Sequence, residues 1–132
     1  MVGSIGVLSM HVDCSRWNEQ QGLGVTYIHA GKYKVEGNAD APLDKESRAE
    51  MQRHVDRYYR MFVESVARNR GATVERVESE FGQGRIVGAQ DAVRRGMADR
   101  EGTFETAVAS VARRTSSGTR QLVHRRRLAL HR

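Results

Sequence analysis

The sequence has one cysteine, one proline and no long apolar run in its 132 residues. The lone cysteine, Cys14, excludes an internal disulfide framework and fits a reducing cytoplasm. No stretch approaches the roughly 20 apolar residues needed to cross a bilayer, so we expect no membrane span. Residues 1–12 lack a basic leader and carry His11 in their apolar part, so we expect no signal peptide. We expect a cytoplasmic protein in which Cys14 fills space and is not a nucleophile.

Groupings that bind metals, phosphates or cofactors are also lacking. The five histidines are scattered, and no two lie at metal-ligand spacing on one element. No glycine-rich phosphate loop precedes a helix, because Gly82 and Gly84 lead into an expected strand. We therefore expect no metal site and no cofactor.

Acidic residues are absent from the end of the chain, where residues 113–132 hold seven arginines and no Asp or Glu. The chain's formal net charge of +6 comes from this tail, because residues 1–112 hold 15 Lys and Arg against 16 Asp and Glu, a net charge of −1. A nearly neutral folded part offers no basic face to a phosphate backbone. We expect a disordered basic tail at 113–132, and we expect no nucleic-acid binding outside this tail, which could also contact an acidic partner.

Residues 1–112 show alternating strand and helix patterns. SIGVLSMHV (4–12) is apolar on both alternating faces, as in a strand covered on both sides, and GVTYIH (24–29) is rich in β-branched and aromatic residues. Helical periodicity is strongest between an N-cap at Asp44 and a stop at Gly71. Shorter helices are expected at 13–21, 73–80, 89–95 and from Thr103, with brief extended pieces at 84–87 and 97–99. This order predicts an α/β fold.

Two lysines, Lys32 and Lys34, follow the expected strand 24–29 in a polar loop. Sites in parallel α/β sheets are usually built at the C-terminal ends of strands. On spacing alone, however, two solvated loop lysines are the simpler interpretation.

Four segments occur in a recognisable order: VGSIGV (2–7), IHAGKYKVEGN (28–38), FVESVARNRG (62–71) and GRIVGAQDAVRRGMAD (84–99). Together they resemble the signal peptide peptidase A family of Ser/Lys-dyad serine peptidases over about residues 2–112. The KVEGN ending is most similar to the branch of phage minor capsid proteins that act as head-maturation proteases.

The resemblance implies a Clp protease/crotonase-like fold and an endopeptidase acting on peptides or proteins. It assigns the general base to Lys34, with Lys32 as a neighbour, and a lysine-orienting hydroxyl to Ser4. A lysine accepts a serine proton only when neutral, so such a site must lower the lysine pKa by roughly three units from about 10.4. The resemblance also implies a homo-oligomer, in the cytoplasm or in a phage prohead.

The family's nucleophilic serine has no counterpart here. In the family it lies upstream of the Gly-Ser-Ile-Gly strand, and none of the nine serines in this sequence has the required neighbours. We therefore expect residues 1–112 to be the C-terminal part of a catalytic domain, truncated at its N-terminus and inactive alone. Two alternatives stay open: a half that donates its lysine to a serine-bearing subunit, and a non-catalytic capsid or scaffold interaction module.

Overall fold

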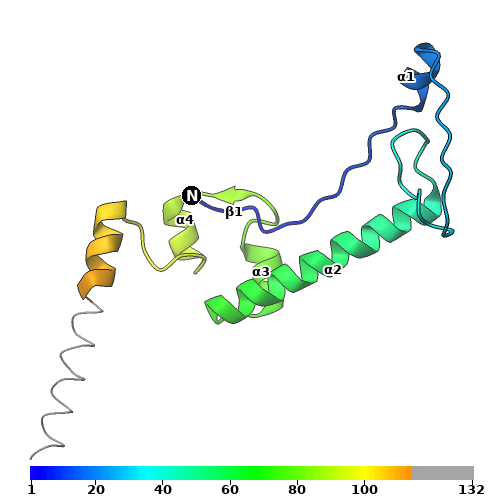
Figure 1. The fold of residues 1–132 in the computed structure, drawn as a ribbon. Helices are drawn as coiled ribbons and strands as arrows, with labels where there is room; N and C mark the ends of the chain where they lie inside the picture. The colour runs from blue at the N-terminus through cyan, green and yellow to red at the C-terminus, as the bar shows by residue number, and fades with distance from the viewer. Residues whose placement is uncertain (114–132) are drawn as a thin grey trace, which may run out of the picture. The chain divides into compact units, whose positions relative to one another are not determined.

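The computed structural model describes residues 1–113, in two compact units that divide after Met97. The first unit contains, in order, β1 (Val2–Gly3), α1 (Ser15–Gln20), α2 (Lys45–Arg70), α3 (Val74–Glu80), β2 (Ile86–Val87) and α4 (Ala89–Arg94), as Figure 1 shows. In the second unit, residues 104–113 are helical. The tail expected at 113–132 lies outside the described residues except for its first residue.

Helix α2 begins and ends where the sequence predicts. The Asp44 carboxylate accepts hydrogen bonds from the Ser47 amide at 2.9 Å and the Ser47 hydroxyl at 2.6 Å, which caps the first turn. Gly71 ends the helix in a left-handed conformation with φ of 60°, and its amide donates to the Ala67 carbonyl. The long helix is therefore confirmed.

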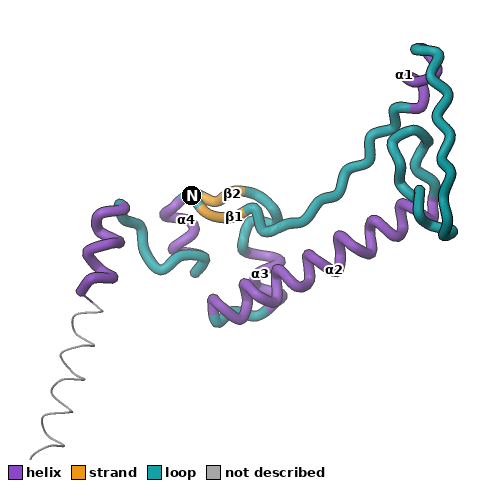
Figure 2. Tube along the Cα trace, viewed as in Figure 1, coloured by secondary structure: helices purple, strands orange, loops and turns teal. Residues whose placement is uncertain are grey.

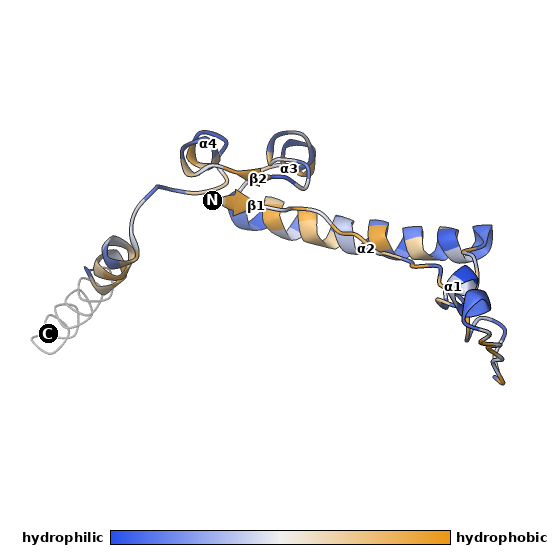
Figure 3. Ribbon diagram, turned by 90° about the horizontal axis from the view of Figure 1, so that it is seen from above, coloured by the Kyte–Doolittle hydropathy of each residue, from blue (hydrophilic) through white to orange (hydrophobic). Residues whose placement is uncertain are grey.

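The core of the first unit lies where the C-terminal half of α2 packs against α3. Its buried side chains are Ile5, Val63, Ala67, Val77 and Phe81. The α2 residues change from hydrophilic near α1 to more apolar near β1, as Figure 3 shows, so only one end of the helix can build a core. Helix α3 is capped by Thr73, whose hydroxyl accepts from the Arg76 amide at 3.2 Å.

The only sheet in the described residues joins β1 to β2 in antiparallel register, with Val2 opposite Val87 and Gly3 opposite Ile86. Gly3 has φ of 136°, and a Cβ there would lie 2.4 Å from the Arg85 carbonyl oxygen. Only glycine fits this position, because a side chain would collide with backbone. β2 confirms the brief strand expected near 84–87.

The two longer expected strands do not form. Segments 4–12 and 24–29 have no strand pairing and run as loop in Figure 2. Leu8 and Met10 are 85% and 77% exposed, and Ile28 is 99% exposed. A strand needs a hydrogen-bonded neighbour along its length, and the described chain supplies only one such bond, from the Ser4 amide to the Arg85 carbonyl. The prediction was wrong because a strand pattern does not reveal whether a partner strand is present.

The shorter helices agree with the sequence. α1 is followed by Gly22 in a left-handed conformation, and α4 by Gly96. The helix at 104–113 begins after Thr103, whose hydroxyl accepts from the Thr106 amide at 3.3 Å. Its expected apolar face is largely exposed in the described chain, with Phe104 79% exposed. The short extended piece expected at 97–99 is not a strand.

Candidate functional site

The lysine loop is a series of tight turns immediately before α2. The Lys34 amide donates to the Gly31 carbonyl at 3.2 Å, and the Glu36 amide donates to the Tyr33 carbonyl at 3.2 Å. Gly31 and Gly37 have φ of 96° and 67°, which side-chain-bearing residues rarely adopt. The two glycines thus bracket a compact turn that presents Lys34.

Three connections tie the end of this loop to earlier parts of the chain. His11 Nε2 bonds to the Asn38 carbonyl oxygen at 2.8 Å, and the Cys14 amide donates to the Ala39 carbonyl at 2.7 Å. The buried Asn18 side chain donates to Asp40 Oδ1 at 2.7 Å. The lysine loop is therefore anchored to α1 and to the segment that leads into it.

Asp40 is an anchoring residue that sequence reasoning missed. Its second carboxylate oxygen accepts from the Tyr27 hydroxyl, and its amide donates to Asn38 Oδ1 at 2.9 Å. The hydrogen bond to Asp40 raises the pKa of Tyr27, because the nearby carboxylate disfavours a phenolate. The Asn-X-Asp spacing at 38–40 was the available signal, since these residues favour side-chain-to-backbone turns.

Lys32 and Lys34 have different surroundings. Lys32 Nζ donates to the Tyr33 hydroxyl at 2.9 Å and lies 3.8 Å from Glu46 Oε1. The Tyr33 hydrogen bond and then the Glu46 charge raise the pKa of Lys32. A raised pKa keeps an amine protonated, which is the opposite of what a general base requires. These contacts favour Lys34 over Lys32 as a candidate base.

Lys34 is exposed, and its amine makes no hydrogen bond or ion pair within residues 1–113. A nearby pocket of about 240 Å³ is lined by Lys32, Tyr33 and Glu46, among others, but not by Lys34. Lys34, to which the resemblance assigns the general base, thus lies on a hydrogen-bonded turn, and its amine is available to another group.

Ser4 lies beside β2. Its amide donates to the Arg85 carbonyl at 3.0 Å, and its φ of 56° is unusual for a residue with a side chain. No hydrogen bond joins Ser4 to Lys34 in the described chain, so the structure does not bring the two candidate site residues together.

The described residues hold no group of three or more His, Cys, Asp or Glu side chains arranged to bind a metal ion. Every helix within residues 1–113 is too short or too polar to cross a membrane.

Similarity to known proteins identifies the family. Residues 1–117 match peptidase family S49. The head-tail preconnector protein of Enterobacteria phage P21 is 33% identical over 119 residues, which cover 90% of this chain and 23% of that protein. The capsid assembly protease C of Escherichia phage lambda is 32% identical over 97 residues, 74% of this chain and 22% of that protein.

A plant relative extends the range of the similarity. The chloroplastic serine protease SPPA of Arabidopsis thaliana is 30% identical over 110 residues, 83% of this chain and 16% of that protein. The chain thus spans less than a quarter of the length of each of these three relatives. Both the signal peptide peptidase A resemblance and its phage branch are confirmed. This chain belongs to peptidase family S49.

Proposed function

We propose that this chain is the lysine-bearing part of a Ser/Lys-dyad endopeptidase, with Lys34 as the general base. Two observations together support the proposal. Residues 1–117 match family S49, and the lysine turn lies within this match. Of the two lysines in this turn, only Lys34 has an amine without a hydrogen bond or ion pair to the described residues. Lys32 interacts with Tyr33 and Glu46, whereas the Lys34 amine remains available to another group.

In the proposed reaction, a serine hydroxyl attacks the peptide carbonyl carbon while the neutral amine of Lys34 takes its proton. The resulting ammonium then gives a proton to the leaving amine, and water hydrolyses the acyl-serine ester. Burial of a lysine amine away from carboxylates lowers its pKa. Lys34 is exposed here, so we infer that the serine-bearing segment also covers this lysine.

The nucleophilic serine is supplied by residues other than these 132, because none of the nine serines has the neighbours of the family's nucleophile. The complete domain would have a Clp protease/crotonase-like fold. Segments 4–12 and 24–29 support this proposal, since Leu8, Met10 and Ile28 are exposed and, after the Ser4 amide, neither backbone pairs with a strand in the described chain. Both would become strands when a neighbouring segment supplies their hydrogen bonds.

Ser4 would then orient the lysine amine. Its amide is fixed by Arg85, and Gly3 before it admits no side chain, so the start of the segment is firmly placed. Residues 1–112 would form one part of the catalytic domain, and residues 113–132 a basic tail.

The two phage relatives, named for head-tail connection and capsid assembly, support a role in capsid assembly. The substrate would then be a protein of the prohead, and the peptidase would act there as a homo-oligomer.

The test joins this chain to the serine-bearing segment of a family S49 relative and measures cleavage of a denatured protein substrate. We expect no turnover by the chain alone and turnover by the joined protein. Lys34→Ala should abolish this turnover, whereas the matched Lys32→Ala should retain it. Turnover by the chain alone that is lost in Lys34→Ala would show that the serine lies within these residues.

A further inference from the structure

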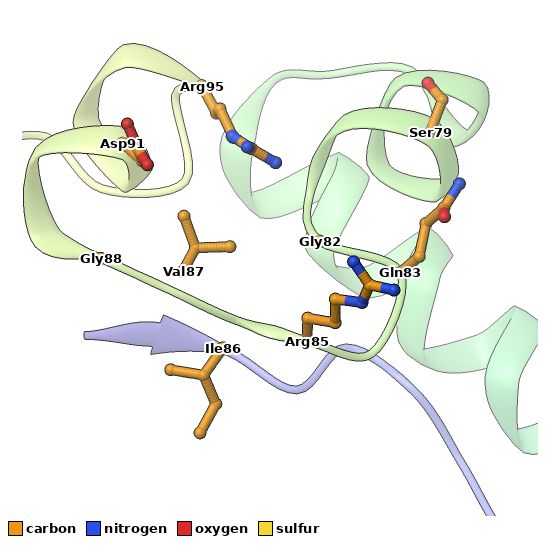
Figure 4. A pocket seen from close by; sticks show the side chains of 9 residues that line it. All are labelled: Ser79, Gly82, Gln83, Arg85, Ile86, Val87, Gly88, Asp91 and Arg95. Carbon is orange, nitrogen blue, oxygen red and sulfur yellow. The ribbon is translucent and has the colours of Figure 1, made fainter.

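A polar pocket of about 310 Å³ lies between the end of α3, the turn at 82–85 and α4. Figure 4 shows Arg95 extending toward the pocket from the end of α4 and Arg85 from the turn at 82–85, where its guanidinium lies beside Gln83; Val87 is buried. Ser79 and Gln83 add a hydroxyl and an amide to its lining, and Asp91 adds a carboxylate.

The backbone that carries Arg85 is tightly constrained. Gln83, although not a glycine, has φ of 49° between Gly82 at 94° and Gly84 at 87°. The Arg85 amide donates to the Gly82 carbonyl at 2.8 Å, and its carbonyl accepts from the Ser4 amide at 3.0 Å. Its guanidinium makes no hydrogen bond or ion pair with any residue in the described range 1–113. A fixed backbone thus presents an unneutralised cation.

Arg95 is oriented by a backbone contact and not by an acid. Its Nη1 donates to the Glu80 carbonyl at 2.8 Å, while its own carbonyl accepts from Arg76 Nη2 at 3.1 Å. The Glu80 carboxylate is paired with Arg76 Nε at 3.0 Å. The guanidinium of Arg95 is therefore held in place without a neutralising carboxylate.

Asp91 is the one acid that lines the pocket, and its Oδ1 is engaged by the Arg94 guanidinium. The two nearby carboxylates are therefore paired with other arginines, Glu80 with Arg76 and Asp91 with Arg94. Two cations that face one pocket are left without an anionic partner in the described chain.

We propose that this pocket binds a carboxylate, the acidic side chain of a peptide, between Arg85 and Arg95. Guanidinium groups bind carboxylates through paired, charge-assisted hydrogen bonds. A single anionic group is favoured over a nucleic-acid backbone, because residues 1–112 carry 15 basic and 16 acidic side chains and offer no continuous basic track. The proposal does not depend on Lys34 being a base, and its test measures binding alone.

The test uses the full chain and a capped seven-residue peptide with one central glutamate and an uncharged dye, followed by fluorescence anisotropy. The comparison is the same peptide with glutamine. We expect the glutamate peptide to bind about fivefold more tightly at low salt, with the preference shrinking as salt screens the pairing. Arg85→Gln should remove the preference, and Arg95→Gln should reduce it.

Arg48→Gln is the matched control. Arg48 is an exposed arginine on α2 whose side chain makes no ion pair or hydrogen bond in the described part of the chain. This variant should keep the full preference for glutamate. Circular dichroism shows whether each variant is folded, and Arg85→Gln removes no side-chain contact of the fold.

Equal binding of the glutamate and glutamine peptides would overturn the proposal. So would an equal loss of preference in Arg48→Gln, which would show only nonspecific attraction. Inorganic phosphate is the second probe: binding of phosphate without binding of the glutamate peptide would also overturn it.

Discussion

At the scale of single residues, the most informative contacts surround Asp40 and not the lysines themselves. Its carboxylate accepts hydrogen bonds from both Asn18 and Tyr27, and so links α1, the segment 24–29 and the lysine loop. Lys34 makes no such contact, so the geometry of its turn depends on backbone hydrogen bonds and on this anchor.

Removing the Asp40 carboxylate should therefore loosen the turn. We expect Asp40→Ala to speed hydrogen exchange at the Lys34 and Glu36 amides by about tenfold, because a hydrogen bond to a charged group contributes about 1.5 kcal/mol or more. Mass spectrometry of deuterium uptake measures the effect. Asp56→Ala, on the exposed face of α2, is the control. Unchanged exchange in Asp40→Ala would mean that the turn is held without Asp40.

At the scale of elements, the N-terminus of α2 is capped by an ionisable group, the Asp44 carboxylate. The side-chain and backbone hydrogen bonds of Ser47 lower the pKa of Asp44 below its ordinary value of 3.8. A carboxylate whose pKa is lower in the folded state than in the unfolded state adds to the free energy of unfolding. This contribution is fully present when the pH is above the unfolded-state pKa, and it is lost as the pH falls through the folded-state pKa. Acid should therefore weaken the N-terminus of α2.

The prediction compares the chain with Asp44→Asn, which can cap the helix without a charge. As pH falls from about 5 to about 2, the original chain should lose more thermal stability than the variant. Melting followed by circular dichroism at several pH values measures this difference. Parallel pH curves for the two proteins would show that Asp44 does not contribute through its ionised form.

The helices and the short strand β2 could be predicted from the sequence, but the two longer strands predicted from it do not form. The limits of α2 depend on local groups, namely the Asp44 cap and the left-handed Gly71, which the sequence contains in full. The same holds for Thr73 before α3. Segments 4–12 and 24–29 have strand-like patterns, but a strand also depends on a neighbour, which no local pattern supplies.

In the candidate site, too, the sequence indicated single residues but not the contacts between distant parts of the chain. Lys34 and Ser4 were selected by resemblance to a family, and the family is confirmed. The resemblance did not indicate the contacts of Asp40, His11 and Asn18, because these join positions that are far apart in the sequence. Nor did the sequence separate the two arginines of the polar pocket, Arg85 and Arg95, from other surface arginines.

At the scale of the whole molecule, segment 4–12 exposes large apolar side chains. Leu8, Met10 and Val12 of this segment are 85%, 77% and 52% exposed. An unpaired, apolar backbone segment is a template for association with another chain. In the proposed peptidase, this segment would be covered by the part of the domain that carries the serine.

The chain alone should therefore self-associate, and the double variant Leu8→Lys with Met10→Lys should shift it toward the monomer. Sedimentation velocity over a range of concentrations measures this shift. Met61→Lys is the control, because Met61 is 56% exposed on α2 and outside the segment. If the unaltered chain is a stable monomer, segment 4–12 does not drive association, and the prediction is wrong.

The central claim is that Lys34 is the base of a dyad whose serine comes from outside these residues. It is tested most directly by kcat/KM of the joined protein as a function of pH, for the unaltered lysines, Lys34→Ala and Lys32→Ala. We expect Lys34→Ala to lower kcat/KM by at least about a hundredfold, as loss of a general base does, and to remove the rise in activity with pH. Lys32→Ala should keep both the rate and the pH profile. Full activity in Lys34→Ala, or the loss of activity in Lys32→Ala instead, would contradict the claim.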